Sequence, residues 1–180
     1  MPYVRGACCL TLLLLAVITV VNAEDALAQP EMPKVDARVC KLLPMAELEA
    51  HYASKAPRVS GSDDSVLSVC TANFGSFIVR LESGPHDPVQ LPPNVSTALM
   101  GVKAMLGNSK QLQFLDTHDF GRIGCYRTKV SFGGDTTHST VCVMMPDGWY
   151  LNFMMTHADP QRVSYEVVKL MIEKIAARRK

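Results

Sequence analysis

Four cysteines constrain the fold of this chain most, because each disulfide joins two segments that are distant in sequence. Two of the six cysteines fall within an N-terminal export signal, and Cys40, Cys70, Cys125 and Cys142 remain. An even number of cysteines in an exported chain predicts two disulfides, with three possible pairings. We expect Cys40–Cys70 and Cys125–Cys142, because the last two fall in neighbouring predicted strands, whose side chains can approach closely on one face.

Residues 1–28 predict a cleavable export signal. Arg5 precedes an apolar run of 12 residues, 10–21, and small-residue cleavage sites follow, ending at Ala23 and at Ala28. This combination is typical of a signal peptide, whereas a membrane span needs about 20 apolar residues. An uncleaved anchor is the alternative. We expect cleavage after Ala28, a periplasmic or secreted protein, and no integral membrane segment after cleavage.

The charge of the remaining chain argues against two classes of partner. Residues 1–28 contain one basic and two acidic residues, so the rest carries 17 basic and 15 acidic residues. So small a surplus gives no reason to expect binding to nucleic acid or to an anionic membrane surface. The basic tail at residues 177–180 complements the macrodipole of a final helix.

Three segments have helical periodicity. Residues 44–54 form the first, and the second follows the N-cap Asn94, with an apolar stripe at Val95, Ala98, Leu99, Val102, Met105 and Leu106. The third begins at Asp159-Pro160, an N-cap followed by proline. We expect its buried stripe to comprise Val163, Val167, Leu170, Met171 and Ile175.

Strand patterns and turn residues fill the intervals between the helices. The predicted strands are residues 66–74, 76–82, 111–115, 123–132, 139–145 and 149–156, with turns at 133–135 and 146–148. Residues 29–37 are predicted to be a flexible lead-in, and 57–65 and 83–93 to be loops. The order α-β-β-α-β-β-β-β-α predicts one α+β domain at 38–180, with helices packed on an antiparallel sheet.

Several short motifs resemble those of small exported bacterial proteins with a PsbP/Mog1-like fold, many of them lipoproteins of unknown function. The matching residues are the CKLLPMAELE segment at 40–49, Val69-Cys70-Thr71, the GRIGCY segment at 121–126 and the closing amphipathic helix. The chain departs from that group in two places: it has no lipobox, and Asn73-Phe74 stands where an aromatic usually follows the cysteine closely. The resemblance implies the fold and an extracytoplasmic binding or accessory role, and it supplies no catalytic residues.

The last predicted strand supplies the candidate binding surface. Trp149, Leu151, Phe153 and Met155 alternate with Tyr150, Asn152 and Met154, so the two sets lie on opposite faces. We expect the Trp149 set to be core and the Tyr150 set to form a mixed polar and aromatic surface, of the kind that interfaces favour. This surface then consists of Tyr150, Asn152 and Met154.

The histidines give the only other chemical candidates. His138 and His157 are each about ten residues from the 146–148 turn, so they are the pair to suspect if a metal binds. His118 lies between Asp116 and Asp119, where a polar loop is the plainer interpretation. Methionines near the same turn could hold copper(I), but they alternate between faces, which favours core packing.

The sequence predicts a non-catalytic exported binding or accessory protein. No nucleophile motif, phosphate loop or tight metal motif is present in it, so we expect no enzyme activity, no cofactor and no bound metal. The partner is a small ligand in a pocket between sheet and helices, or a protein, as for an inhibitor or immunity protein. A metal-handling periplasmic protein is the remaining alternative.

Overall fold

The computed structural model describes residues 38–179, except for 65, 88–91, 108–111 and 147. The signal and lead-in predicted for residues 1–37 lie outside this part. The helices are η1 Arg38–Leu42, α1 Met45–Tyr52, α2 Val95–Leu106, η2 Pro160–Val163 and α3 Tyr165–Arg178. The strands are β1 Arg58–Asp63, β2 Ser68–Phe74, β3 Phe77–Pro85, β4 Leu112–Asp119, β5 Ile123–Phe132, β6 Asp135–Met144 and β7 Trp149–His157. Within the described residues no helix is long and apolar enough to cross a membrane.

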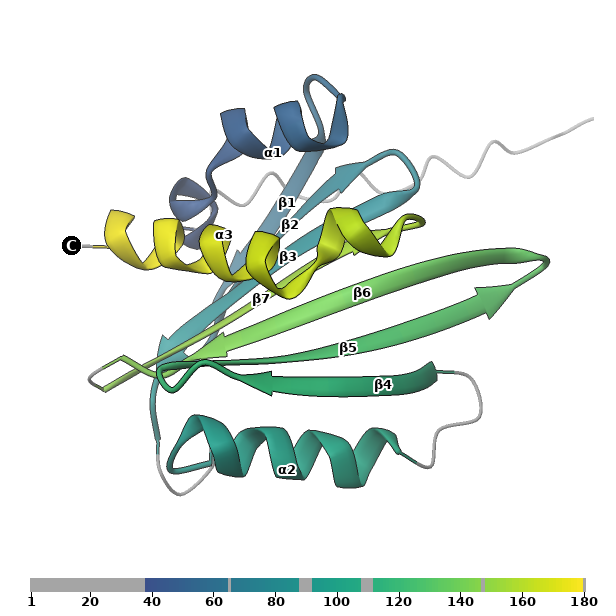
Figure 1. The fold of residues 1–180 in the computed structure, drawn as a ribbon. Coiled ribbons are helices and arrows are strands. Elements are labelled where there is room, and N and C mark those ends of the chain that lie inside the picture. The colour runs from purple at the N-terminus through teal and green to yellow at the C-terminus, as the bar shows by residue number, and fades with distance from the viewer. Residues whose placement is uncertain (1–37, 65, 88–91, 108–111, 147, 180) are drawn as a thin grey trace, which may run out of the picture. The chain divides into compact units, whose positions relative to one another are not determined.

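The strands form one antiparallel sheet in the order β1-β2-β3-β7-β6-β5-β4 (Figure 1). The predicted α+β class and the antiparallel sheet are therefore confirmed. The prediction of a loop over residues 57–65 was wrong, because Arg58–Asp63 pairs with β2 as an edge strand. Its residues are mostly exposed on both faces, so it lacks the apolar alternation by which a half-buried strand is recognised.

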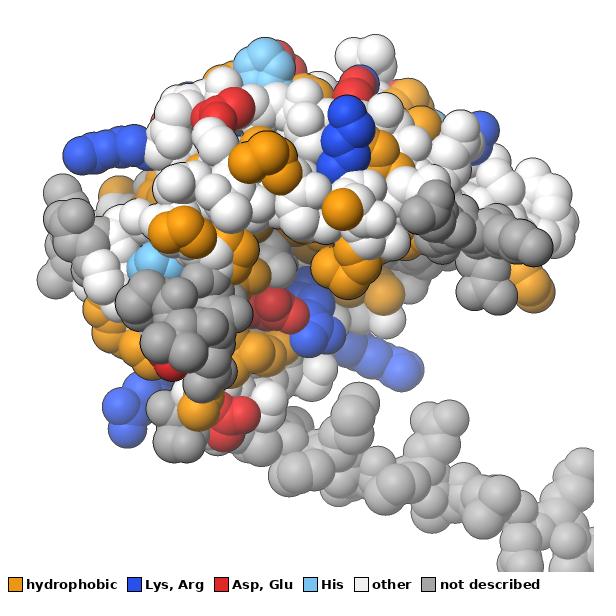
Figure 2. Space-filling model, turned by 90° about the horizontal axis from the view of Figure 1, so that it is seen from below, with side chains coloured by type: hydrophobic (Ala, Val, Ile, Leu, Met, Phe, Trp, Pro, Cys, Tyr) orange, Lys and Arg blue, Asp and Glu red, His pale blue; other side chains and the backbone are white. Residues whose placement is uncertain are grey.

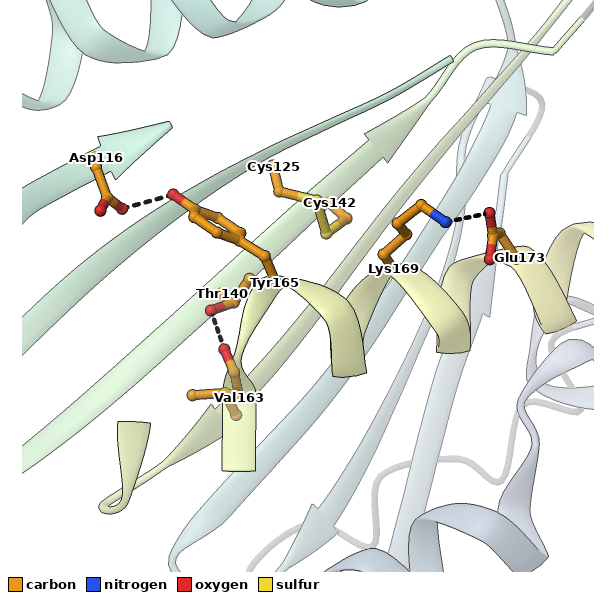
Figure 3. Close-up of a disulfide and its surroundings, with 8 residues drawn as sticks. All are labelled: Asp116, Cys125, Thr140, Cys142, Val163, Tyr165, Lys169 and Glu173. Carbon is orange, nitrogen blue, oxygen red and sulfur yellow. Dashed lines mark hydrogen bonds and ion pairs between the residues drawn. A yellow bond between two sulfur atoms is a disulfide. The ribbon is translucent and has the colours of Figure 1, made fainter. Parts of the chain in front are cut away.

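The hydrophobic core lies on the face of the sheet that α1, α3 and η1 cover (Figure 1). Phe153, Leu151 and Met155 of β7 are fully buried there, as predicted. Two polar contacts anchor the covering elements: the Tyr52 hydroxyl donates to the Thr156 carbonyl over 3.0 Å, and the Thr140 hydroxyl donates to the Val163 carbonyl (Figure 3).

The last helix begins later than its sequence signal predicts. Asp159 caps the short η2 turn, where its carboxylate accepts a hydrogen bond from the Gln161 amide, and α3 begins at Tyr165. This start changes the phase of the buried stripe. Val168, Met171, Ile172 and Ile175 are buried, whereas Leu170, which was expected in the core, is 51% exposed.

Both disulfides join the expected pairs. Cys40 of η1 is bonded to Cys70 of β2, and Cys125 of β5 to Cys142 of β6, with Cα atoms 5.1 and 4.1 Å apart. Cys125 and Cys142 are directly opposite in the strand register, and their bridge lies beneath α3 (Figure 3). Cys70, Cys125 and Cys142 are fully buried, so both bridges are part of the core.

Helix α2 packs on the opposite face of the sheet, over β4 and β5. Asn94 caps it as predicted, with its side-chain oxygen accepting from the Thr97 amide. The helix can approach because β5 has Gly124 beneath it, where an added Cβ would lie 2.3 Å from Val95 Cγ1. The predicted stripe is buried only in its first half: Val95, Ala98 and Leu99 are buried, but Met105 is 71% exposed.

Candidate functional site

Helix α2 covers only part of the sheet face that is opposite the hydrophobic core. The uncovered part of that face carries the side chains predicted to form a binding surface. We call it the open face, and its members are Ile78, Arg80, Glu82, Tyr126, Tyr150, Asn152 and Met154. The register places Arg80 opposite Met154 and Glu82 opposite Asn152. Figure 2 shows, on this side, acidic and basic side chains next to each other in a recess among hydrophobic ones.

A hydrogen-bonded row of polar side chains organises the open face. The Arg80 guanidinium donates to one oxygen of Glu82 over 2.7 Å, and the Asn152 amide donates to the other over 3.1 Å. These contacts fix the Glu82 carboxylate and the plane of the Asn152 amide. The other amide atom, Oδ1 of Asn152, is buried without a partner among the described residues, which leaves one acceptor unused on this face.

Two tyrosines flank that row and are largely buried against it. Burial and the nearby Glu82 carboxylate raise the pKa of Tyr126, and burial with the same carboxylate raises the pKa of Tyr150 to about 12. Both phenols are therefore neutral hydroxyl groups at physiological pH, able to donate a hydrogen bond. Tyr150 and Asn152 lie on the predicted face, although Tyr150 is less exposed than the sequence suggests.

The placement of Trp149 in the core was wrong. Its side chain is 40% exposed, and the Arg179 guanidinium lies over the indole ring, 3.3 Å from the ring centroid. Trp149 does share a face with Leu151 and Phe153, as predicted, but it is the first residue of β7 and lies at the end of the sheet. The core does not extend that far, because only the last turn of α3 reaches it.

The structure brings the suspected metal pair together without completing a site. His138 and His157 are directly opposite in the β6–β7 register. The His157 ring stacks on Phe77 at 4.3 Å, and its Nδ1 accepts from the Asp159 amide over 2.9 Å. Burial lowers the pKa of both histidines. Among the described residues no three histidine, cysteine or carboxylate side chains are grouped to hold a metal ion.

The carboxylates beside His118 have other partners. Both Asp116 oxygens accept from the Arg127 guanidinium, over 2.8 and 2.5 Å, and the Tyr165 hydroxyl donates to Asp116 over 2.5 Å (Figure 3). These bonds lower the pKa of Asp116. Asp119 accepts from the Ser96 hydroxyl over 2.6 Å. The DTHD segment is therefore structural, although it is a strand and not the predicted loop.

A break in the strand register sets the direction of Asp116. The pairing of β4 with β5 shifts between Phe114 and Asp116, so Phe114 lies on the α2 side while Asp116 meets Tyr165 at the start of α3. Sequence reasoning missed this cluster because its members come from three separate elements and no local motif links them.

The methionines behave as predicted: Met155 is fully buried, and its neighbour Met154 lies on the open face.

No family model matches the chain, and no curated protein shows significant similarity to it. Among solved structures, it is similar to LpqN, described as involved in cell envelope biogenesis of Mycobacterium tuberculosis, with 13% sequence identity and a TM-score of 0.26. The alignment covers 66% of this chain and 64% of LpqN.

Proposed function

We propose that this chain is an exported, non-catalytic binding protein, and that its open face holds a partner polypeptide. Export is supported by the signal pattern at residues 1–28 and by two buried disulfides, because disulfides persist in oxidising extracytoplasmic compartments. The absence of a catalytic role stays an expectation from the sequence, which has no nucleophile motif.

One observation carries the choice of surface: an ordered row of polar side chains lies on a part of the sheet that no described helix covers. Exposed polar side chains on a solvent face are ordinarily mobile, and ordering them costs conformational entropy. Here Glu82 is already fixed by Arg80 and Asn152, so a partner that binds across them does not pay that cost again. The surrounding tyrosine, methionine and arginine side chains are types that are enriched at protein interfaces.

The charge of the open face favours a polypeptide over an ionic ligand. Arg80 and Glu82 neutralise each other, which leaves no surplus charge in the row to attract a phosphate or a metal ion. The hydroxyls of Tyr126 and Tyr150 can donate to the C=O groups and accept from the N–H groups of a polypeptide backbone. An inhibitor or immunity protein, as the sequence suggested, is one form that such a binding protein can take.

The test compares two charge insertions at similar exposure on opposite faces. Ile78 is 39% exposed on the open face, and Val59 of β1 is 45% exposed on the other face. Immobilised wild type and Val59→Arg should retain the same polypeptide, in near-equal molar amount, from the extracytoplasmic fraction of the producing cells. Ile78→Arg should lose it by tenfold or more, with an unchanged melting temperature, because a buried unpaired charge is costly at an interface. Retention of the polypeptide by Ile78→Arg would overturn the assignment.

A further inference from the structure

A pocket with a volume of about 470 Å³ is lined by the C-terminal half of α3 and by the end of the sheet where β6 turns into β7. Its apolar lining comes from Met144, Pro146 and Leu151 on the sheet side and from Ala176 and Ala177 on α3. Ligand pockets typically measure about 300–1,000 Å³ and are mostly apolar with few polar groups. The pocket is separate from the open face, because Leu151 and Met144 lie on the core side of the sheet.

The charged side chains around this pocket do not balance. Glu173 is the one carboxylate among the described lining residues, and the Lys169 ammonium already donates to it over 2.7 Å (Figure 3). Arg122, in the turn before β5, and Arg179, at the end of α3, also line the pocket. Neither arginine forms an ion pair with a residue that the structure describes. Among the residues that the structure describes, the pocket lining therefore has two guanidinium groups beside an apolar floor and no second carboxylate to neutralise them.

Trp149 fixes one of these guanidinium groups in place. Arg179 lies over the exposed indole with its central carbon 3.3 Å from the ring centroid, so among the described residues stacking on Trp149, and not an ion pair, holds it. Partial burial lowers the pKa of Arg179. An anion at this position would pair with the guanidinium, and an arginine that stacking already orders loses less entropy on binding.

We infer that this pocket binds a single-chain amphiphilic anion, such as a fatty-acid carboxylate. The hydrocarbon chain lies on the floor formed by Met144, Leu151 and Ala176, and the anionic head pairs with Arg122 and Arg179. The hydrocarbon chain thus matches the apolar lining, and the anionic head matches the two guanidinium groups. A small inorganic anion would leave the apolar floor in water, and a neutral alcohol would leave both guanidinium groups unpaired.

The test uses decanoate and decanol, which share the same chain and differ in the head group. Trp149 is the only tryptophan of the chain and contacts Arg179, so its fluorescence reports directly on the site, with calorimetry as an independent measurement. Decanoate should bind saturably as a monomer, at least tenfold more tightly than decanol. Acetate, which has the head group without the chain, should not bind. Equal affinity for decanoate and decanol, or no saturable decanoate binding by either method, would overturn the inference.

Variants separate the head-group contacts from the floor. The double variant Arg122→Gln, Arg179→Gln should weaken decanoate binding at least tenfold and leave decanol nearly unaffected. Arg58→Gln is the matched control, because Arg58 is an exposed arginine of β1 that does not line this pocket. Ala177→Phe places a ring in the pocket from an exposed helix position and should block both probes. Unchanged decanoate affinity in the double variant would refute the assigned head-group site.

An anionic head group on a hydrocarbon chain occurs both in free fatty acids and in membrane lipids. A vesicle-binding experiment therefore distinguishes these two sources. Sedimentation with phosphatidylglycerol vesicles should leave the protein in the supernatant. Co-sedimentation that excess decanoate does not reverse would mean that a membrane, and not a free amphiphile, is the ligand. Ile78→Arg, which disrupts the open face, should bind decanoate as wild type does. Decanoate binding at the pocket and polypeptide binding at the open face are therefore tested independently.

Discussion

Arg179, the C-cap of α3, covers the exposed indole of Trp149 on β7, with 3.3 Å between the guanidinium carbon and the ring centroid. The contact joins the residue after the last helix to the first residue of the last strand, where the core-side row of β7 leaves the core. The row Trp149, Leu151, Phe153 thus runs from partly exposed to fully buried within five residues. Because of this gradient, Trp149 and Phe153, although both are aromatic, should contribute very differently to the free energy of unfolding.

Trp149→Ala should lower the free energy of unfolding by only about 1 kcal/mol, the contribution of an exposed cation–π contact. Phe153→Ala empties a fully buried site and should cost about 3–5 kcal/mol. Urea unfolding of both variants checks the difference. A loss at Trp149 as large as that at Phe153 would place the indole in the core after all.

Gly124→Ala should destabilise the protein by about 1–3 kcal/mol, because the added methyl group would lie 2.3 Å from Val95 Cγ1 and 2.9 Å from Leu99 Cδ1. Gly101→Ala is the matched control within α2. Nothing lies within 4 Å of an added Cβ there, so the helix should gain about 0.5–1 kcal/mol. If both substitutions stabilise the protein, α2 does not rest on β5 as described.

The disulfides should differ in their rate of reduction. Cys40 is partly exposed, whereas Cys70, Cys125 and Cys142 are fully buried. A thiol reductant under native conditions should therefore open Cys40–Cys70 first. The bridges close loops with sequence separations of 30 and 17 residues, which correspond to about 4 and about 3 kcal/mol in the chain-entropy model. Timed alkylation and peptide mapping give the order, and earlier opening of Cys125–Cys142 would contradict it.

The Asp116 cluster should make part of the stability depend on pH. Hydrogen bonds from Arg127, and then from Tyr165, lower the pKa of Asp116 in the folded state. A lowered pKa contributes stability that is present above the unfolded value, about 3.9, and is lost as the pH falls through the folded value. Asp116→Asn should cost about 1 kcal/mol at pH 7, after discounting for solvent screening, and this deficit should shrink below about pH 4.

The exposed hairpin residue Asp135 provides the control for this pH dependence. Asp135→Asn removes a carboxylate that forms no ion pair with a described residue, so it should leave stability nearly unchanged across the same range. Denaturant unfolding at pH 3, 5 and 7 measures all three proteins. A deficit in Asp116→Asn that grows on acidification would have the wrong sign for this cluster.

The sequence predicted the elements whose signals are local. The cap Asn94 and the β5–β6 and β6–β7 hairpins lie where their turn and cap residues indicate. The pairing of Cys125 with Cys142 followed from that hairpin, because it needed only two adjacent strands. Strand β1 was missed because hydrogen bonding to β2 holds it in the sheet, while its side chains bury little apolar surface.

The site was less predictable, because its properties depend on contacts between distant segments. The alternation along β7 correctly assigned Tyr150 and Trp149 to opposite faces of the sheet. It could not predict which residues of β7 are covered by α3, and Trp149 lies beyond them. Glu82 and Tyr126 join the open face only through the order of the strands, in which β3 lies beside β7. The same order places His138 opposite His157, yet the local bond from the Asp159 amide already occupies one ring nitrogen.

The central claim, that the open face holds a partner polypeptide, is tested most directly by site-specific photocrosslinking. A benzophenone amino acid at position 78 lies on the open face, and one at position 170 lies on the exposed side of α3. Irradiation in the extracytoplasmic fraction of the producing cells should give one discrete polypeptide adduct from position 78 and none from position 170. Adducts from position 170 alone, or equal adducts from both positions, would contradict the account.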